Sequence, residues 1–217
     1  CMLAANVCAA KFLEELAVPA LYRVHEPPKE RKLELLKDFL SELGLSLRSY
    51  EDIKPADYQA IIQAVAHRPD ASLIQTVLLR SMNQAVYSPE NKGHFGLAYQ
   101  AYTHFTSPIR RYPDLLTHRA IRSLIRSDRP SKRVRRHPDA PIVAAAQTYP
   151  YSVTDIVTLG EQCSLTERRA DEATRDVVGW LKCEYLQSRV GEVFQGIVSA
   201  VVGFGLFVEL SDLFVEG

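Results

Sequence analysis

The sequence lacks the cysteine patterns that mark metal sites and disulfide frameworks. Its four cysteines, Cys1, Cys8, Cys163 and Cys183, include no C-x-x-C pair and no cysteine–histidine spacing typical of zinc ligands. Neither a structural zinc ion nor a set of disulfides is therefore predicted. Such cysteine usage best fits a reducing compartment, and we expect a cytoplasmic protein.

Long apolar runs are also missing. No stretch approaches 18 uninterrupted apolar residues, so no membrane-spanning helix is predicted. The opening segment CMLAANVCAAKFLEEL lacks a basic leader and carries Lys11, Glu14 and Glu15 at helical spacing, which favours a helix over a signal peptide. Because the chain starts at Cys1 and stops at Gly217 just after a strand-like run, we expect it to be part of a longer protein.

The chain also lacks a net charge. The 26 basic and 26 acidic residues cancel, so the total charge does not point to nucleic acid. Their distribution is nevertheless uneven, because residues 104–137 hold ten Arg and Lys but only two Asp. A local basic stretch is typical of a polyanion-binding surface. A solvated helix face beside a charged loop would give the same composition, so both interpretations stay open.

The apolar content is sufficient for a sizeable core. With 217 residues, of which 47% are hydrophobic, the chain is expected to form one or two domains. The spacing of apolar residues predicts an α+β protein that is mostly helical. Helices are expected over residues 1–17, 29–43, 55–66, 69–86, 114–125 and 153–188. Short strands are expected at 20–25, 94–99 and 102–105, and a long loop at 127–152.

The stretch HFTSPIRRYPDLLTHR, residues 104–119, concentrates the chemistry. Thr106, Ser107 and Pro108 have the order of an N-cap and a first helical residue, and a helix start offers free backbone N–H groups to an anion. Arg110 would lie at the third helical position and add a planar, bidentate guanidinium. The pattern predicts a phosphate-binding site.

The second half of the stretch predicts a change of direction. Pro113 should push Tyr112 out of helical angles, and Asp114 should then begin a second helix with its carboxylate near the N-terminus. Farther along this helix, Arg119 and its neighbours at helical spacing form a basic face.

Three other features have a structural and a functional interpretation. Asn6 is either a packing amide or a ligand contact. His94 and His104 lack a third metal ligand at a plausible spacing, which favours structural histidines. The acidic residues of segment 166–176 alternate with arginines, so a salt-bridged helix surface is favoured over a pair of metal carboxylates.

From Val190 onward the apolar period becomes two. GEVFQGIVSAV and FGLFVEL predict two strands joined at Gly203 and followed by the start of a third. Residues 190–217 are too few to close a five-stranded barrel. Phe204 and Phe207 are interpreted as stacking partners for bases, as on OB-fold surfaces, or as core residues.

These motifs together resemble the ribonuclease II/ribonuclease R family of bacterial exoribonucleases. The similarity lies in AANVCAA, LYRVH, GHFGLA followed by HFTSPIRRYPDL, CSLTERRADEATRDVVGWLK and GEVFQGIVSAVVGFGLFVEL. By this resemblance, residues 1–188 are the C-terminal part of an RNB-type catalytic domain. Residues 190–217 are the first strands of a truncated OB-fold of the ribosomal S-one type.

The resemblance implies processive, magnesium-dependent hydrolysis of RNA from its 3′ end to nucleoside 5′-monophosphates. The family's metal-binding aspartates form a cluster N-terminal to the part represented here and have no match in this sequence, so no metal ligand is assigned. Arg110 matches the family arginine that contacts the phosphate at the cleaved bond and is the expected catalytic residue. The expected RNA-binding residues are Thr106, Ser107, Arg111, Tyr112, Arg119, Phe204 and Phe207.

Three functions compete at this point. The first is a fragment of a 3′–5′ exoribonuclease that binds RNA, does not bind a membrane and is a monomer; alone it would be inactive. The second is a noncatalytic RNA-binding module, and an Asp-rich cluster upstream of Cys1 would separate it from the first. The third treats the arginines as surface charge without a nucleic-acid partner, which the salt dependence of RNA affinity would test.

Overall fold

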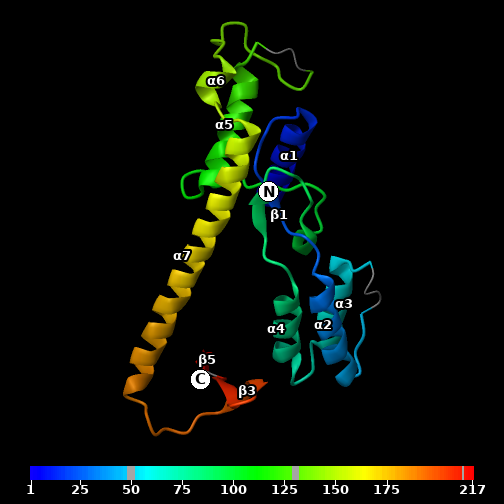
Figure 1. Cartoon of the computed structure of the whole chain (residues 1–217), viewed down its shortest axis with the longest axis vertical. Coiled ribbons are helices and arrows are strands. Elements are labelled where there is room, and N and C mark those ends of the chain that lie inside the picture. Colours follow the sequence, from blue (N-terminus) through cyan, green and yellow to red (C-terminus); the bar gives the residue numbers. More distant parts are fainter. Residues whose placement is uncertain (48–51, 129–131, 212) are drawn as a thin grey trace. The chain divides into compact units, whose positions relative to one another are not determined.

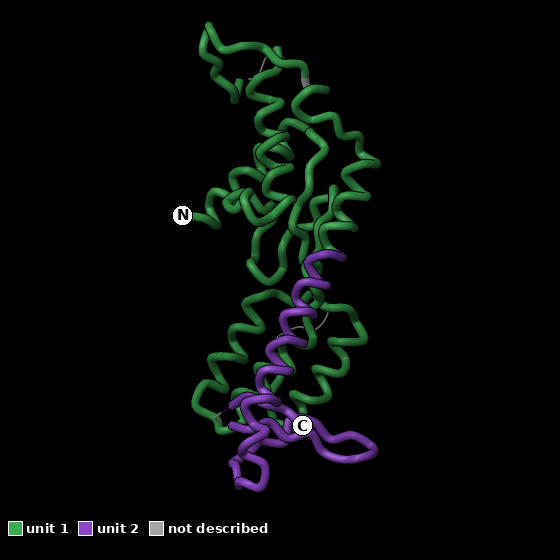
Figure 2. Tube along the Cα trace, turned by 90° about the vertical axis from the view of Figure 1, so that its left-hand side faces the viewer, with its two compact units in different colours: residues 1–164 green, residues 165–217 purple. Residues whose placement is uncertain are grey.

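The structure is a computed structural model that describes residues 1–47, 52–128, 132–211 and 213–217. It divides into two compact units, Cys1–Ser164 and Leu165–Gly217, which Figure 2 colours separately. Its mixture of helices and small sheets agrees with the predicted fold class. No helix in the described ranges is both long and apolar enough to cross a membrane.

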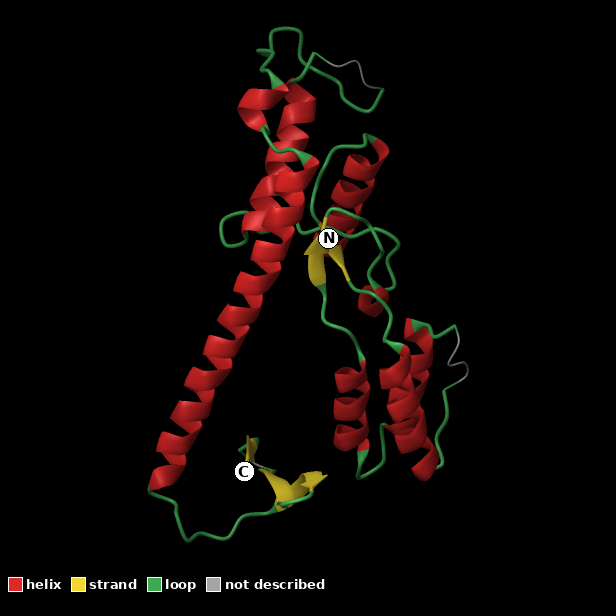
Figure 3. Cartoon of the chain, viewed as in Figure 1, coloured by secondary structure: helices red, strands yellow, loops and turns green. Residues whose placement is uncertain are grey.

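Three helices of the first unit pack together into a helical layer (Figures 1 and 3). They are α2 (Glu30–Glu42), α3 (Pro55–Val65) and α4 (Ala71–Ser81). Pro55 is well suited to the first turn of α3, because its fixed φ fits a helix and it has no N–H to satisfy. The apolar faces meet in a core that includes Leu36, Ile61 and Ile74.

The helix predicted over residues 69–86 is shorter than expected. It ends at Ser81, because Met82 has extended angles (φ −68°, ψ 155°). Val86 instead pairs with Val24 in a two-stranded antiparallel sheet formed by β1 (Tyr22–Val24) and β2 (Val86–Ser88). Val86, the last apolar residue of the predicted helical pattern, therefore belongs to a strand.

The strand predicted at residues 94–99 is wrong, because this segment forms a 3-10 turn, η1 (Phe95–Leu97). The chain reverses at Ala98, which has a left-handed φ of 56°. This reversal returns Tyr99 to His94, whose N–H donates to the Tyr99 carbonyl at 2.8 Å. The segment 102–105 is not a strand either, although the Arg23 N–H donates to the Tyr102 carbonyl at 2.9 Å and holds it beside β1.

A second core lies among α1 (Met2–Glu15), α5 (Tyr112–Arg126) and the first turns of α7 (Val153–Gln187). Tyr149, which directly follows α6 (Ala145–Thr148), belongs to this core as well. Gly160 allows α7 to approach the sheet, since a Cβ there would lie 2.9 Å from both Leu21 Cδ2 and the Tyr87 carbonyl oxygen. The predicted loop 127–152 contains the short α6, and its basic residue Arg129 lies outside the described residues.

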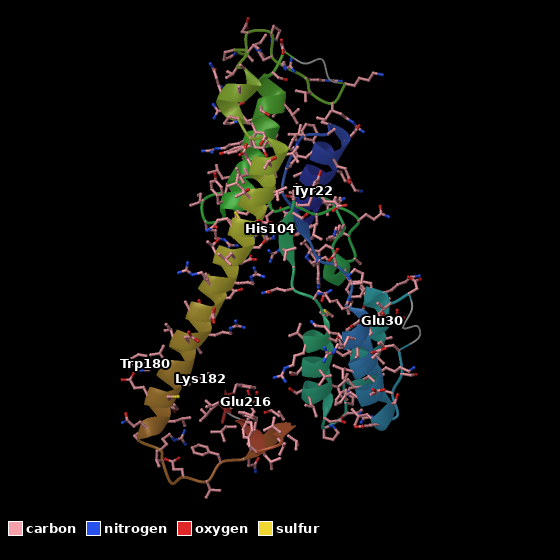
Figure 4. The ribbon with its side chains drawn as sticks, in the orientation of Figure 1. Tyr22, Glu30, His104, Trp180, Lys182 and Glu216 are labelled. Atoms are coloured by element: carbon pink, nitrogen blue, oxygen red, sulfur yellow. The ribbon has the colours of Figure 1, made fainter. Side chains whose placement is uncertain are left out.

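The second unit contains the rest of α7 and a three-stranded antiparallel sheet. Its strands are β3 (Gly196–Val202), β4 (Gly205–Leu210) and β5 (Val215–Glu216), paired in that order. The Lys182 ammonium of α7 donates to the Phe214 carbonyl just before β5, and Figure 4 labels Lys182 and Glu216. Within the described residues the sheet stays open, as expected for too few strands to close a barrel.

Candidate functional site

The segment that leads into the HFTSPIRRYPDL motif is fixed by buried polar groups. The Asn6 amide donates to the Tyr102 hydroxyl (2.9 Å) and its oxygen accepts from the Phe105 N–H (3.2 Å). The Thr103 hydroxyl donates to the Leu21 carbonyl at 2.6 Å. These contacts assign Asn6 the packing role that was one of its two interpretations. They hold the start of the motif against α1 and β1.

The helix predicted to follow Ser107 is reduced to a single turn, and the second helix, predicted from Asp114, begins two residues earlier at Tyr112. Residues 108–110 form a single turn, in which the Arg110 and Arg111 N–H groups donate to the Ser107 carbonyl at 3.3 and 3.1 Å. Arg111 then has extended angles (φ −126°, ψ 119°) and precedes α5, so Tyr112, expected to be non-helical, is the first helical residue. We call residues 107–111 the Ser107–Arg111 turn.

The Asp114 carboxylate explains why the chain turns here. Asp114 is the third residue of α5 and its side chain is fully buried. One oxygen accepts from the Ser107 N–H at 2.7 Å and from Arg111 Nη2 at 2.9 Å, and the other accepts from Arg111 Nε at 2.8 Å. The Ser107 N–H therefore binds this carboxylate and is not available to an external anion. To this extent the segment differs from the predicted helix start, whose N–H groups were expected to be free.

The tip of the turn points away from the protein. Ile109 is fully exposed (102%), and Arg110 is exposed as well. Within the described part of the chain, no hydrogen-bond or ion-pair partner is found for the Arg110 guanidinium. Arg111 has only 22% of its side chain exposed and is bound to Asp114. Of the two adjacent arginines, only Arg110 is free to meet a ligand.

Three histidines, His25, His94 and His104, form a cluster with tyrosines. His94 packs edge-on against His25 and Tyr102, with ring centroids 5.0 and 5.4 Å away. His104, labelled in Figure 4, lies 2.9 Å from the Tyr87 hydroxyl through Nδ1. No group of three or more His, Cys, Asp or Glu residues that could hold a metal ion is found among the described residues. The rings of His94 and His104 pack against each other's neighbours, and both lie edge-on to the Tyr102 ring.

Burial sets the charge of this histidine cluster. It lowers the pKa of His94 to about 4, helped by His25 and Arg23. It also lowers the pKa of His104 to about 4, helped by the Arg111 and Arg23 guanidinium groups and opposed by Asp114. Both rings are therefore neutral near pH 7. The positive charge of the candidate site comes from its arginines.

Tyr112 and Arg119 meet on the exposed side of α5. The Tyr112 hydroxyl lies 3.4 Å from the Tyr151 hydroxyl, which also accepts from Arg119 Nη1 at 3.0 Å. The hydrogen bond to Tyr151, followed by partial burial, raises the pKa of Tyr112. Tyr151 had no assigned role, because it falls in the segment interpreted as a loop without a steady period.

The remaining predicted residues differ in position. Thr106 is half-buried just before the turn. Phe204 and Phe207 belong to the second unit, on either side of the start of β4, with ring centroids 6.2 Å apart. Phe204 is 87% exposed, whereas Phe207 is half-buried. Phe204 is thus accessible to a stacking ligand, and Phe207 supports it from the side.

Comparison with known proteins identifies the class. The profile of the RNB domain matches residues 1–127, and the chain belongs to the RNB domain family. "Ribonuclease R" of Escherichia coli (strain K12) is 49% identical over 217 residues, which are all of this chain and 26% of that protein. The chain spans about a quarter of the length of the curated relatives that it matches.

Solved structures share the fold. Mycoplasma genitalium RNase R in complex with ribose methylated single-stranded RNA matches with a TM-score of 0.85 and 26% identity, over 100% of this chain and 32% of that chain. Yeast Ssd1, described as a pseudonuclease, matches with a TM-score of 0.75 and 19% identity, over 99% of this chain and 25% of that chain. The likeness to Ssd1 concerns the fold alone.

Proposed function

We propose that this chain supplies the phosphate-binding half of the active site of a hydrolytic 3′–5′ exoribonuclease. The proposed enzyme degrades RNA processively to nucleoside 5′-monophosphates, as a monomer in the cytoplasm. The observation that carries the proposal is Arg110, exposed at the tip of a turn whose two ends are fixed and without a side-chain partner among the residues that the structure describes. The solved relative from Mycoplasma genitalium that binds single-stranded RNA supports RNA as the substrate.

Arg110 would act by electrostatic stabilisation. A guanidinium presents a planar fork that matches two phosphate oxygens. Negative charge grows on those oxygens as the phosphodiester bond is cleaved, so a fixed cation stabilises the transition state more than the bound substrate. Arg110 therefore contributes mainly to turnover, while more distant arginines contribute to affinity.

Magnesium belongs to the proposed enzyme, but the described residues do not fit a magnesium site. They contain no cluster of acidic side chains that could hold the ion. In this chemistry the ion would activate water and stabilise the leaving oxygen. We propose that its ligands lie outside these 217 residues, and we assign none here.

The test is the Arg110→Ala variant in the full-length protein that contains this chain. Turnover of a single-stranded RNA should fall about 10²–10³-fold, the usual cost of removing one donor to a developing oxyanion. RNA affinity should change only a few-fold. Arg31→Ala is the matched control, since Arg31 is an exposed arginine of α2, and it should leave both quantities near wild type. Wild-type turnover in Arg110→Ala would reject the role.

The second candidate is a noncatalytic RNA-binding module. It is favoured by one observation, the fold shared with a pseudonuclease, because the same scaffold can lose chemistry and keep its surfaces. The full-length protein separates the two functions. Release of nucleoside 5′-monophosphates from a 3′-labelled RNA would support the nuclease, whereas binding without release would support the module.

A further inference from the structure

Asp114 is buried, and within the described residues its side-chain partners all belong to the turn that presents Arg110. Its side chain is fully buried, yet both carboxylate oxygens are used, by the Ser107 N–H and by two nitrogens of Arg111. A buried carboxylate is costly unless it is paired and hydrogen-bonded. Three contacts between 2.7 and 2.9 Å meet that requirement.

These contacts fix both ends of the Ser107–Arg111 turn to one group. Ser107 is bound through its backbone, and Arg111 through its side chain. Backbone hydrogen bonds from Arg110 and Arg111 to the Ser107 carbonyl close the turn between them. The backbone of Arg110 is therefore held, while its side chain stays free to bind. A group held in advance near its working position loses less entropy when the ligand arrives.

The same contacts make Arg111 unsuitable as the phosphate ligand. Its Nε and Nη2 both donate to Asp114, and its side chain is mostly covered. A phosphate that recruited the Arg111 fork would leave the Asp114 carboxylate buried without its counter-ion, which is strongly unfavourable. Arg111 was one of the expected RNA-binding residues, and the geometry favours a different role.

We propose that Asp114 is a positioning residue, which with Arg111 as its internal counter-ion holds the Ser107–Arg111 turn and thereby aims Arg110 at the phosphate. This inference rests on the proposed function, since it concerns how Arg110 performs it. Asp114 touches neither RNA nor the reacting atoms. Its effect on turnover passes through Arg110.

The experiment is a double-mutant cycle in the full-length protein, with Asp114→Asn, Arg110→Ala and the two combined. Asp114→Asn removes the charge and keeps the shape, and it should lower kcat about 10–100-fold with little change in RNA affinity, as expected for a slightly misplaced group. The combined variant should be no slower than Arg110→Ala alone, because without Arg110 there is nothing to position.

The control separates positioning from loss of stability. Thr117→Val changes another buried polar residue of α5, whose hydroxyl donates to the Pro113 carbonyl. It should lower the melting temperature and leave kcat near wild type below that temperature. If Thr117→Val slows turnover as much as Asp114→Asn at the same loss of stability, the positioning role is overturned.

A second variant covers the case in which Asp114→Asn does not fold. Arg111→Lys keeps the positive charge but loses the fork that binds Asp114, so it should lower kcat as Asp114→Asn would. It should also leave the salt dependence of RNA binding unchanged. Wild-type kcat in this variant would overturn the inference.

The outcomes distinguish this inference from the proposed function. Wild-type turnover in Arg110→Ala rejects the proposed function itself. A slow Arg110→Ala with a wild-type Asp114→Asn rejects only the positioning role. Losses that multiply in the combined variant also reject it, because Asp114 would then act independently of Arg110.

Discussion

At the scale of single residues, Gly160 shows how a missing side chain sets the position of a helix. A Cβ at this position would approach the Tyr87 carbonyl oxygen to 2.9 Å, and a backbone atom of a paired strand cannot move aside cheaply. The neighbouring Ser164 hydroxyl accepts from the Tyr87 N–H at 2.9 Å and fixes the same contact. The first turns of α7 are therefore tied to β2 at one point.

Gly160→Ala should destabilise the first unit by about 1–3 kcal/mol, the usual cost of overpacking. Gly179→Ala is the matched control on the same helix, because nothing lies within 4 Å of its added Cβ. The control should be neutral or more stable by about 0.5–1 kcal/mol, since alanine favours a helix over glycine. Urea denaturation of the two variants measures the difference, and equal stabilities would contradict the close approach.

The histidine cluster gives a residue-level prediction for pH. The pKa values of His94 and His104 are lowered to about 4 from 6.5, so the unfolded chain binds more protons between these values. The free energy of unfolding should therefore fall as pH decreases from about 6.5 to about 4 and level off below. Around these rings lie His25, Arg23, Arg111 and Asp114.

The double variant His94→Asn/His104→Asn tests this dependence. An asparagine oxygen can replace Nδ1, which in His94 accepts from the Leu97 N–H and in His104 lies against the Tyr87 hydroxyl. The loss of stability between pH 6.5 and 4 should be smaller in the variant than in the wild type. His67→Gln, at an exposed position, controls for the loss of a histidine. Identical pH profiles would show that the rings are not the source.

At the scale of elements, long helices were more predictable than short strands: β1 lies within the strand predicted at 20–25, whereas β2 was not predicted. α2, α3 and α5 agree with their apolar spacing to within a few residues, because their buried faces repeat over three turns or more. β2 has three residues and is defined by its partner β1, which is far away in the sequence. A pattern within one segment cannot contain that information.

The contact between α3 and α4 yields a prediction about hydrogen-bond direction. The single Ser81 hydroxyl hydrogen goes to the Leu78 carbonyl at 2.6 Å, so the Tyr58 hydroxyl must donate to Ser81, 2.8 Å away. Ser81→Ala leaves a buried tyrosine donor unpaired and should cost about 1–3 kcal/mol. Tyr58→Phe leaves Ser81 bonded and should cost only about 0.5–1.5 kcal/mol.

Thermal or urea denaturation of Ser81→Ala, Tyr58→Phe and the double variant checks this order of stabilities. In the double variant the loss should be less than the sum of the two single losses, because no unpaired donor remains. Ser72→Ala, on the exposed side of α4, is the matched serine control and should stay within about 0.5 kcal/mol of wild type. A larger loss in Tyr58→Phe than in Ser81→Ala would reverse the assigned direction.

At the scale of the whole molecule, two kinds of RNA contact are expected although the net charge is zero. Arg119, in the first unit, would contact phosphate, and Phe204, in the second, would stack on a base. Phosphate contacts release counterions and depend on salt, whereas stacking does not. The chain can therefore be tested for both contacts in one experiment.

Binding of a labelled single-stranded RNA should be measured by fluorescence anisotropy over a range of salt concentrations. Arg119→Ala should reduce the salt slope by about 0.7, the value for one phosphate contact on a single strand. Phe204→Ala should weaken binding by about 1–3 kcal/mol at every salt concentration without changing the slope. Binding with no salt dependence in the wild type would favour the interpretation of the arginines as surface charge.

The sequence could suggest which residues form the candidate site but not how they are arranged. The sequence alone suggested Arg110 and a phosphate, because a Ser-Pro-x-Arg order suggests an anion site. It also suggested one helix capped by Ser107 and a second helix from Asp114. It could not show that Asp114 folds back on Ser107 and Arg111, since that contact depends on the burial of a carboxylate, which a local pattern does not reveal.

The two adjacent arginines have a consequence for how substitutions will be tolerated. Lysine at 110 keeps the charge at the exposed tip of the turn but loses the planar fork proposed to match two phosphate oxygens, so lower turnover with an intact fold is expected. Lysine at 111 keeps the charge but cannot make the two parallel hydrogen bonds that the Arg111 guanidinium donates to the Asp114 carboxylate. A mutational scan should therefore find that the same exchange lowers turnover at both positions but lowers stability only at 111, where the arginine pairs with a buried carboxylate.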